Sequence, residues 1–430
     1  MIWTQTAALP RFEPLKQDIK TDVLVIGGGI AGLLCAYLLD RAGVPCALAE
    51  AERICGGITK NTTAKITAQH GLIYSKLTRT FGGEQAKLYL HANLAALEKY
   101  RSLCQTIDCD FQTRSSAVYS LRDRQKIERE LDALQKIGFP AGRADALPLP
   151  FPVAGAVCFA EQTQFHPLKF LCAIAKDLRI FENTRVLELI PGAAVTQHGT
   201  IRAEKIIVAT HFPFLNKHGS YFLKLYQHRS YVLALQNAPE VRDMYVDESG
   251  SGLSFRSFGD LLLLGGGGHR TGKNGGGWRE LESFARRRYP EAGIAARWAT
   301  QDCMTLDGVP YVGQYARRTP NLYVATGFNK WGMTSAMAAA MLLTDLVLGK
   351  ENPWTELFSP SRTIFRPQLA VNAAESAFHL LTPTVPRCPH MGCALKYNRQ
   401  EHSWDCPCHG SRFTEDGRLI DNPATGDKKR

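Results

Sequence analysis

The sequence lacks the features that would mark a secreted, membrane-spanning or disordered protein. Its first twenty residues have no basic segment followed by an apolar core, so no secretory signal is expected. The apolar run 23–39 is slightly short for a transmembrane helix, and a glycine cluster interrupts it where a strand would turn into a helix. Charged residues make up 21% and apolar residues 45%, which excludes disordered and collagen-like chains. We therefore expect a globular, cytoplasmic protein without a transmembrane segment.

Dense clusters of positive charge are also few. The formal net charge is +11, but the 51 lysines and arginines are spread along the chain, and the densest runs are 286–288 and 428–430. Nucleic-acid-binding proteins usually concentrate such residues on one patch or stripe. We therefore expect no nucleic-acid partner. The charge fits an anionic substrate, an acidic redox partner or plain solubility.

Cysteine is sparse over most of the chain and concentrated near its end. Eight of the twelve cysteines are scattered singly between residues 35 and 303, as expected of reduced thiols in a cytosolic protein. The other four lie within residues 388–408. A chain of 430 residues is also too long for one ordinary hydrophobic core, so two or three domains are expected.

A nucleotide-binding pattern lies near the N-terminus. The apolar run DVLVI is followed by GGGIAG and then by a helical pattern, so that Gly27, Gly29 and Gly32 have G-x-G-x-x-G spacing. These glycines would allow a tight turn, close approach of a pyrophosphate and helix–strand packing. The glycine spacing alone would equally suit a helix-capping turn, but Glu50 ends the next apolar run, where a carboxylate can bind an adenosine ribose. The pattern predicts a dinucleotide site. We assign to it Gly27, Gly29, Ile30, Ala31, Gly32 and Glu50.

Later segments distinguish FAD from NAD. A Gly-Gly pair follows Glu50, a late apolar run ends in Ala-Thr-Gly at residues 325–327, and Gly-Met-Thr at 332–334 opens a helical pattern. Over about residues 20–350 the chain resembles D-amino-acid-oxidase-like flavoproteins, the group of glycine and sarcosine oxidases. The resemblance implies FAD, with a strand at 183–189 closing over the adenine and a late helix whose N-terminus faces the flavin ring. The further cofactor residues that it implies are Gly56, Gly57, Val186, Gly327, Gly332, Met333 and Thr334.

The resemblance also implies the reaction type and four substrate-site candidates. In this group the flavin removes a hydride from a carbon beside an amine, and the protein orients the substrate and supplies charge. Arg229 and Tyr231 begin a strand that lines the substrate cavity in the resembled fold, and a guanidinium pairs bidentately with a carboxylate. His70 follows the Gly-Gly turn, and Lys330 precedes the last flavin helix. The alternatives are a surface charge for Arg229, a structural histidine for His70, and a solvated or phosphate-binding Lys330.

A second glycine run, at residues 265–268, does not repeat the nucleotide-binding spacing. An arginine or a threonine falls where the third glycine is needed. We interpret this run as a turn beside the flavin, and we expect no NAD(P)H-binding domain.

The C-terminal cysteines are paired with histidines. Cys388-x-His390 and Cys406-x-x-His409 are separated by fifteen residues. A tetrahedral zinc site is the alternative for such a set, but zinc fingers usually pair like ligands, C-x-x-C with H-x-x-x-H. One thiolate and one imidazole in each loop suit a Rieske 2Fe-2S cluster, in which one iron takes two cysteines and the other takes two histidines. We therefore favour iron over zinc.

The two loops, CPHMGC and CPCHGSRF, resemble those of the Rieske proteins of cytochrome bc complexes. The resemblance implies a Cys393–Cys408 disulfide between the ligand loops and a hydrogen bond from Ser411 to a cluster sulfide. Phe413 stands where the high-potential members carry a tyrosine hydroxyl, so the potential should be lower. Only residues 365–386 separate the flavoprotein part from the first ligand loop. The base of this domain therefore looks truncated, and the loops are expected to lean on the flavin domain.

Together the two resemblances match bacterial FAD-dependent oxidoreductases with a C-terminal Rieske domain. We expect an α/β (α+β) fold with a Rossmann-like FAD-binding domain, an inserted antiparallel-sheet substrate domain and a small all-β Rieske domain. The expected limits are 1–80, 150–215 and 300–355 for the FAD-binding domain, 81–149 and 216–299 for the substrate domain, 356–383 for a linker and 384–430 for the Rieske domain.

The expected function is oxidation of an amine or amino acid at FAD. Electrons would pass through the 2Fe-2S cluster to an external acceptor, either a protein or a quinone. The alternative is an electron-transfer or redox-sensing flavo-iron-sulfur protein with no small-molecule substrate of its own.

Overall fold

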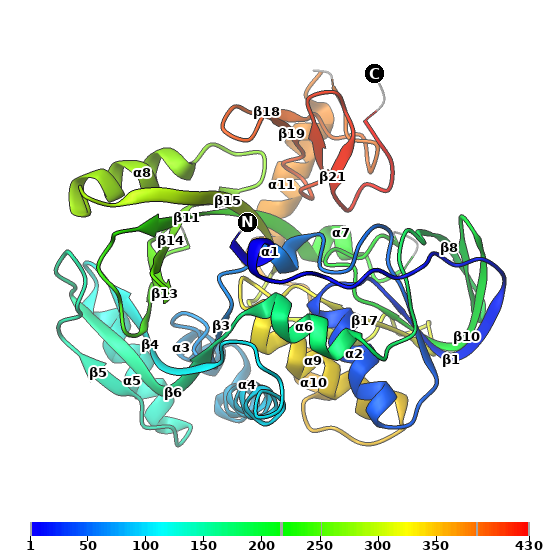
Figure 1. The fold of residues 1–430 in the computed structure, drawn as a ribbon, viewed down its shortest axis with the longest axis horizontal. Helices are drawn as coiled ribbons and strands as arrows, with labels where there is room; N and C mark the ends of the chain where they lie inside the picture. Colours follow the sequence, from blue (N-terminus) through cyan, green and yellow to red (C-terminus); the bar gives the residue numbers. More distant parts are fainter. Residues whose placement is uncertain (1, 216–217, 251, 384–385, 429–430) are drawn as a thin grey trace.

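The structure is a computed structural model that describes residues 2–215, 218–250, 252–383 and 386–428. The predicted domain limits at residues 1, 216, 384 and 430 lie outside these ranges. Two large sheets and one small sheet account for the described strands, and Figure 1 shows the small C-terminal sheet at one edge of the molecule, beside β15 and α8.

The nucleotide-binding sheet has a parallel centre. Strand β1 (Ile19–Ile26) pairs in parallel with β10 (Gly199–Val208) and with β2 (Cys46–Ala49). Val23 and Val25 point to the core formed with α2 (Ile30–Arg41) and α9 (Gly332–Val347), whereas Leu24 and Ile26 point to the opposite face. A strand buried on both faces explains the continuous apolar run in the sequence. The remaining strands of this sheet are β7 (Ile180–Phe181), β8 (Val186–Ile190), β9 (Ala193–Thr196), β16 (Tyr311–Gln314) and β17 (Leu322–Thr326).

The second sheet is mainly antiparallel and has nine strands. Near one end of the sheet, β11 (Leu225–Gln236) pairs with β14 (Leu261–Arg270), and β11 carries the candidate substrate residues Arg229 and Tyr231. The other strands are β3 (Lys65–Ile66), β4 (Gln112–Ser120), β5 (Gly142–Ala144), β6 (Gly155–Gln164), β12 (Met244–Asp247), β13 (Ser254–Phe258) and β15 (Gly293–Thr305).

The strand pairing of this sheet differs from two of the predicted domain limits, those at residues 150 and 300. β6 pairs with β4, so the chain has not yet returned to the nucleotide-binding sheet at residue 150. β15 pairs with β11 as far as Thr305, five residues beyond the predicted limit at 300. Strands of both sheets have similar residue patterns, so the sequence does not show which of the two sheets a given strand joins.

The second glycine run forms part of β14, so its prediction as a turn was wrong. β14 is paired on both sides, with β11 and with β13. A Cβ at Gly268 would lie 2.9 Å from the carbonyl oxygen of Arg229 and 2.9 Å from His228 Cε1. The glycines therefore allow close packing within the sheet, which local spacing alone cannot distinguish from a turn.

Helices cover the sheets and join the parts of the chain. The predicted linker 356–383 contains α11 (Pro367–Leu381), which begins with a proline in its first turn, where the missing N–H costs nothing. The other helices are α1 (Ile2–Thr6), η1 (Ile58–Asn61), α3 (Tyr74–Phe81), α4 (Gly83–Leu103), α5 (Arg124–Lys136), α6 (Pro167–Ala175), α7 (Tyr221–Lys224), α8 (Gly277–Arg288) and α10 (Thr355–Phe358). Within the part of the chain that the structure describes, no helix combines the length and apolar character needed to cross a membrane.

The C-terminal sheet is a short antiparallel meander. It consists of β18 (Lys396–Asn398), β19 (Ser403–Asp405), β20 (Arg412–Thr414) and β21 (Leu419–Asp421). Its core contains Phe413 and all four C-terminal cysteines. Such a small sheet buries little apolar surface of its own, so contacts with the rest of the chain must contribute to its stability.

Candidate functional site

The first part of the site is the glycine turn between β1 and α2. Gly27 has φ 110°, and a Cβ there would lie 2.7 Å from the carbonyl oxygen of Ala209. A Cβ at Gly32 would collide with the backbone of Gly27. A Cβ at Gly29 would approach only the Thr59 hydroxyl, at 3.3 Å, and this glycine borders a cavity. Protein packing therefore requires Gly27 and Gly32, whereas the cavity side requires only that Gly29 leave room for a ligand.

Glu50 is held at the carboxyl end of β2. Its carboxylate accepts hydrogen bonds from the N–H groups of Gly28 at 2.6 Å and Glu52 at 2.9 Å. Burial raises the pKa of Glu50, and these two backbone bonds partly offset that effect. The side chain lines the cavity beside the glycine turn, which is the position predicted for the ribose contact.

A cavity of about 900 Å³ extends from the glycine turn to the C-terminal domain. This volume lies at the upper end of the range for cofactor and ligand sites. Ten of the predicted cofactor residues line the cavity, namely Gly27, Gly29, Ile30, Ala31, Glu50, Gly56, Gly57, Val186, Gly332 and Met333. The other three, Gly32, Gly327 and Thr334, do not line it. The cavity wall and the glycine cradle fit a bound dinucleotide.

His70 lines the cavity but is fully engaged with the protein. One ring nitrogen bonds the Tyr89 hydroxyl at 2.7 Å, and the other lies 2.8 Å from both the Thr67 carbonyl and the Thr334 hydroxyl. Its ring stacks on Trp331, with centroids 5.1 Å apart. Burial lowers the pKa of His70 to about 3, so the ring is neutral. This geometry fits the alternative that His70 is a structural histidine. Its hydrogen bonds to Thr67 and Thr334 connect the loop after β3 with the start of α9.

Arg229 has a protein partner where a substrate carboxylate was predicted. Its Nε donates to Glu401 Oε1 at 3.0 Å, and its Nη2 contacts the other carboxylate oxygen. The Tyr231 hydroxyl donates to the same Glu401 at 2.9 Å. Glu401 lies between β18 and β19, so the carboxylate comes from the C-terminal domain. In this arrangement Arg229 joins two domains and is not open to a substrate.

Lys330 and Asp302 place one charge of each sign on the cavity wall. Lys330 donates to the Gly250 carbonyl at 2.7 Å, and Asp302 accepts from Ser230 at 3.3 Å. Burial lowers the pKa of Lys330 and raises that of Asp302, while each group favours the charged form of the other. The sequence reasoning identified Lys330 and missed Asp302. The signal for Asp302 was an acid inside the otherwise uncharged strand segment WATQDCMT.

The predicted cluster ligands converge in the C-terminal domain. Cys388 and Cys406 are buried together, and hydrogen bonding to Cys406 lowers the pKa of Cys388 to about 7. The rings of His390 and His409 are 5.0 Å apart, and burial lowers their pKa values to about 4 and about 3. Both imidazoles are therefore neutral, which is the form that binds a metal. Two thiols and two neutral imidazoles fit the Rieske ligand set.

The donor set also has the surroundings of a metal site. His409 Nδ1 is buried and has no hydrogen-bond partner among the described residues. The His409 ring interacts with the backbone of Phe222. This interaction raises the pKa of the imidazole, but burial lowers it by more. Metal-binding histidines usually bond a backbone or carboxylate oxygen through their second nitrogen. The nitrogen without a partner is thus left for a metal.

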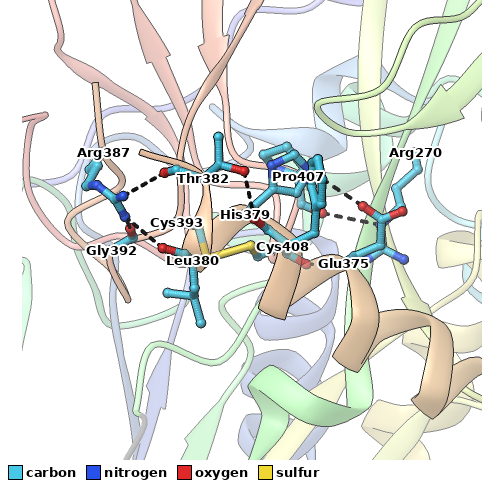
Figure 2. Close-up of a disulfide and its surroundings, with 11 residues drawn as sticks. Arg270, Glu375, His379, Leu380, Thr382, Arg387, Gly392, Cys393, Pro407 and Cys408 are labelled. Carbon is cyan, nitrogen blue, oxygen red and sulfur yellow. Dashed lines mark hydrogen bonds and ion pairs between the residues drawn. A yellow bond between two sulfur atoms is a disulfide. The ribbon is translucent and has the colours of Figure 1, made fainter. Parts of the chain in front are cut away.

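A disulfide joins the two ligand loops. Cys393 pairs with Cys408, as Figure 2 shows. Beside it, Arg387 donates to the carbonyls of Gly392 at 2.6 Å and Thr382 at 2.7 Å, which fixes the first loop to the end of α11. The disulfide leaves Cys388 and Cys406 as the free thiols of the two loops.

Residues of the second sheet contact and support the second of the two ligand loops. Gln301 donates to the Gly410 carbonyl at 2.8 Å, and Arg270 reaches the Pro407 carbonyl at 3.3 Å (Figure 2). A Cβ at Gly410 would collide with Gln227, so the loop lies directly on the second sheet. These contacts supply the support that the short C-terminal sheet does not provide itself.

Comparisons with known proteins agree with both parts of the site. Residues 22–346 match the family described as FAD dependent oxidoreductase, and residues 365–429 match the Rieske [2Fe-2S] domain. YhfW of Bacillus subtilis (strain 168), which bears the name of a Rieske 2Fe-2S iron-sulfur protein, is 33% identical over 98% of this chain and 95% of its own. Gamma-glutamylputrescine oxidoreductase of Escherichia coli (strain K12) is 24% identical over 84% of this chain and 93% of its own.

Solved structures share the fold of the flavin part. Glycine oxidase from Geobacillus kaustophilus has a TM-score of 0.67 at 20% identity, over 80% of this chain and 99% of its own. L-proline dehydrogenase from P. horikoshii has a TM-score of 0.67 at 17% identity, over 81% and 98%. The predicted fold class and both predicted cofactors are confirmed. The chain belongs to the FAD dependent oxidoreductase family and carries a C-terminal Rieske [2Fe-2S] domain, so its cofactors are FAD and a 2Fe-2S cluster.

Proposed function

We propose that the protein oxidises a small-molecule amine or amino acid at FAD and passes the electrons to its Rieske cluster. One observation carries this proposal. A single cavity is lined at one end by the nucleotide-binding glycine turn and at the other by residues 419–422 and 424–425 of the Rieske domain. Relatives named for glycine, L-proline and gamma-glutamylputrescine support the amine or amino-acid class.

The cavity wall suits a substrate that carries both charges. Bound FAD supplies the acceptor for a hydride from the carbon beside the amine. Lys330 can orient a carboxylate, and Asp302 can orient an ammonium group, because both lie on the wall in a partly buried setting. Partial burial strengthens both interactions relative to water. The neutral His70 would position the start of α9 against the cofactor without itself carrying charge.

The outward path of the electrons also belongs to this proposal. Rieske potentials span roughly −150 to +300 mV, which makes such a cluster a suitable acceptor for electrons from flavin. An external acceptor, a protein or a quinone, would then reoxidise the cluster. The cytoplasm remains the predicted location of the reaction.

A second candidate is an electron-transfer protein without its own substrate. The observation that favours it is the pairing of Arg229 with Glu401, which removes the arginine expected to bind a substrate carboxylate. In that case the flavin would exchange electrons only with protein partners or quinones.

Anaerobic screening separates the two candidates. Amines and amino acids are mixed with holoprotein, and bleaching of the flavin absorbance and the paramagnetic signal of the reduced cluster are recorded. Bleaching by one compound class, followed by cluster reduction, is the expected result. The Cys406→Ser variant should still bleach but lose activity with one-electron acceptors. If no amine or amino acid bleaches the flavin while a reduced protein partner or quinol does, the second candidate replaces the first.

A further inference from the structure

Residues 209–212 separate the cavity from the cluster ligands. Ala209, Thr210 and His211 line the cavity, next to the glycine turn. Phe212 follows directly, and its ring lies edge-on to two imidazoles, with centroids 6.4 Å from His390 and 6.3 Å from His409. One short segment therefore contacts the flavin cavity on one side and both histidine ligands on the other.

Both domains hold this segment in place. On the flavin side, the Ala209 N–H donates to the Ile26 carbonyl at 2.8 Å, which continues the parallel pairing of β1 and β10. On the Rieske side, Asn422 Nδ2 donates to the carbonyls of Thr210 at 2.6 Å and Phe212 at 2.8 Å. The segment thus cannot shift against either domain without breaking hydrogen bonds.

Phe212 could be an ordinary core residue, since it is fully buried beside Val208 and Leu225. Two observations go beyond that role. Its ring packs against two ligand imidazoles that are themselves at right angles to each other. Asn422, a residue of the opposite domain, holds its backbone carbonyl.

We propose that residues 209–212 form the electron-transfer contact between FAD and the cluster. In this arrangement Phe212 positions the two ligand imidazoles against the cavity wall, and Asn422 fixes the segment. The inference rests on the proposed transfer from FAD to the cluster and adds its route, through the histidine side. Each transfer moves one electron and forms no bond. Reduced FAD loses two electrons in two such steps and its protons to solvent, and an external one-electron acceptor reoxidises the cluster in between.

The test compares Phe212→Leu with Phe159→Leu. Leucine at 212 keeps the apolar volume and removes the ring. Phe159 is buried like Phe212, but it lies outside the cavity lining, and its ring packs against Tyr74 and Phe139. The flavin is photoreduced anaerobically with 5-deazaflavin, and cluster reduction is followed by visible circular dichroism and freeze-quenched paramagnetic resonance. FAD, iron and sulfide contents and the cluster's resonance spectrum are measured for each variant. A Gly29→Leu protein without FAD reports direct reduction of the cluster by the photoreductant.

We expect Phe212→Leu to keep both cofactors and to slow cluster reduction roughly tenfold to a hundredfold, the scale on which small displacements of reacting groups change rates. Phe159→Leu should match the wild type. If Phe212→Leu loses the cluster, Asn422→Ala tests the route instead. This variant removes the hydrogen bonds that hold residues 210 and 212 but keeps the Phe212 ring, and we expect the same slowing of cluster reduction. Wild-type rates in a cofactor-replete Phe212→Leu or in Asn422→Ala would overturn this route alone. A wild-type cluster that stays oxidised beside reduced flavin would overturn the proposed function itself.

Discussion

Replacing Glu401 by glutamine should weaken the attachment of the Rieske domain. The Glu401 side chain is 8% exposed, and that of Arg229 is 2% exposed. Glu401 also contacts Arg412 at 2.8 Å and Tyr231 at 2.9 Å. Arg412 has two further acids, Asp405 and Asp421, each at 3.0 Å. Arg229 has only Glu401 among the ion pairs found in the described residues, so the substitution removes the paired carboxylate from its buried charge.

The expected cost is about 3 kcal/mol. Removing one partner of a buried ion pair typically costs about 3–5 kcal/mol, because the remaining charge stays out of water. Glutamine keeps the shape of the side chain and one acceptor oxygen for Arg229, which places the cost at the lower end. Exposed pairs contribute about 0–1 kcal/mol. Glu415→Gln is therefore the control, since its side chain is 59% exposed beside His402.

The assay is urea unfolding of the holoprotein, followed by the visible circular dichroism of the cluster. Linear extrapolation gives the free energy of the transition that releases the cluster. A double-mutant cycle with Arg229→Gln should show a coupling energy of about 1–3 kcal/mol between the two residues. If Glu401→Gln shows the same transition as the wild type and Glu415→Gln, the ion pair does not hold the Rieske domain and the reasoning is wrong.

The same ion pair predicts a dependence on pH. Burial alone would raise the pKa of Glu401, but Arg229 and Arg412 lower it below its ordinary value. A carboxyl group with a lowered folded-state pKa stabilises the protein fully above its unfolded pKa, about 4.3, and the stabilisation is lost as the pH falls through the folded value. The difference in stability between wild type and Glu401→Gln should therefore shrink below about pH 4.3 and stay constant above about pH 5.5.

Three further predictions concern the cofactors. Gly29→Leu should fold and keep iron but lose FAD, because its side chain would enter the cavity. A Gly29→Leu protein with stoichiometric FAD would contradict this assignment. Gly426→Ala is the control, because a Cβ there has open space and the backbone is not left-handed. Metal analysis should find iron with acid-labile sulfide and no zinc, and zinc without iron would refute the Rieske assignment. The Cys388→Ser and His409→Ala variants should each lose the cluster while FAD absorbance remains. Phe413→Tyr should raise the midpoint potential of the cluster in a redox titration, since Phe413 is buried in the core with the cluster cysteines and a hydroxyl there can donate to sulfur. An unchanged or lower potential would show that the hydroxyl does not reach the cluster.

The parts of the site that the sequence predicted are those specified by short-range patterns. The strand, glycine turn and helix at residues 22–41 lie within twenty residues of one another, so spacing alone describes their geometry. The predicted cluster ligands sit in two loops fifteen residues apart, and the chemistry of iron fixes which side chains such loops need. The resemblance of both segments to known families was sufficient for fold class and cofactors.

The interpretations that failed or stayed open depend on contacts between distant segments. The 265–268 glycines resemble a turn until the pairing of β14 with β11 and β13 places them inside a sheet. Asp302 faces the cavity only because β15 lies at the end of that sheet, beside β11. No local periodicity encodes either fact.

The sequence by itself determined that this chain binds FAD and carries a Rieske cluster, because each cofactor requires a compact motif whose residue types and spacing follow from its chemistry. The tertiary structure decided how the two centres meet. Arg229 and Glu401 are 172 residues apart in sequence, and Asn422 is 210 residues from Phe212. Such pairs depend on the packing of whole domains. A single sequence does not show which of its distant side chains this packing brings into contact. Only the folded chain shows that Arg229 binds a carboxylate of its own Rieske domain, and that the four residues after β10 lie between the cavity and the rings of His390 and His409.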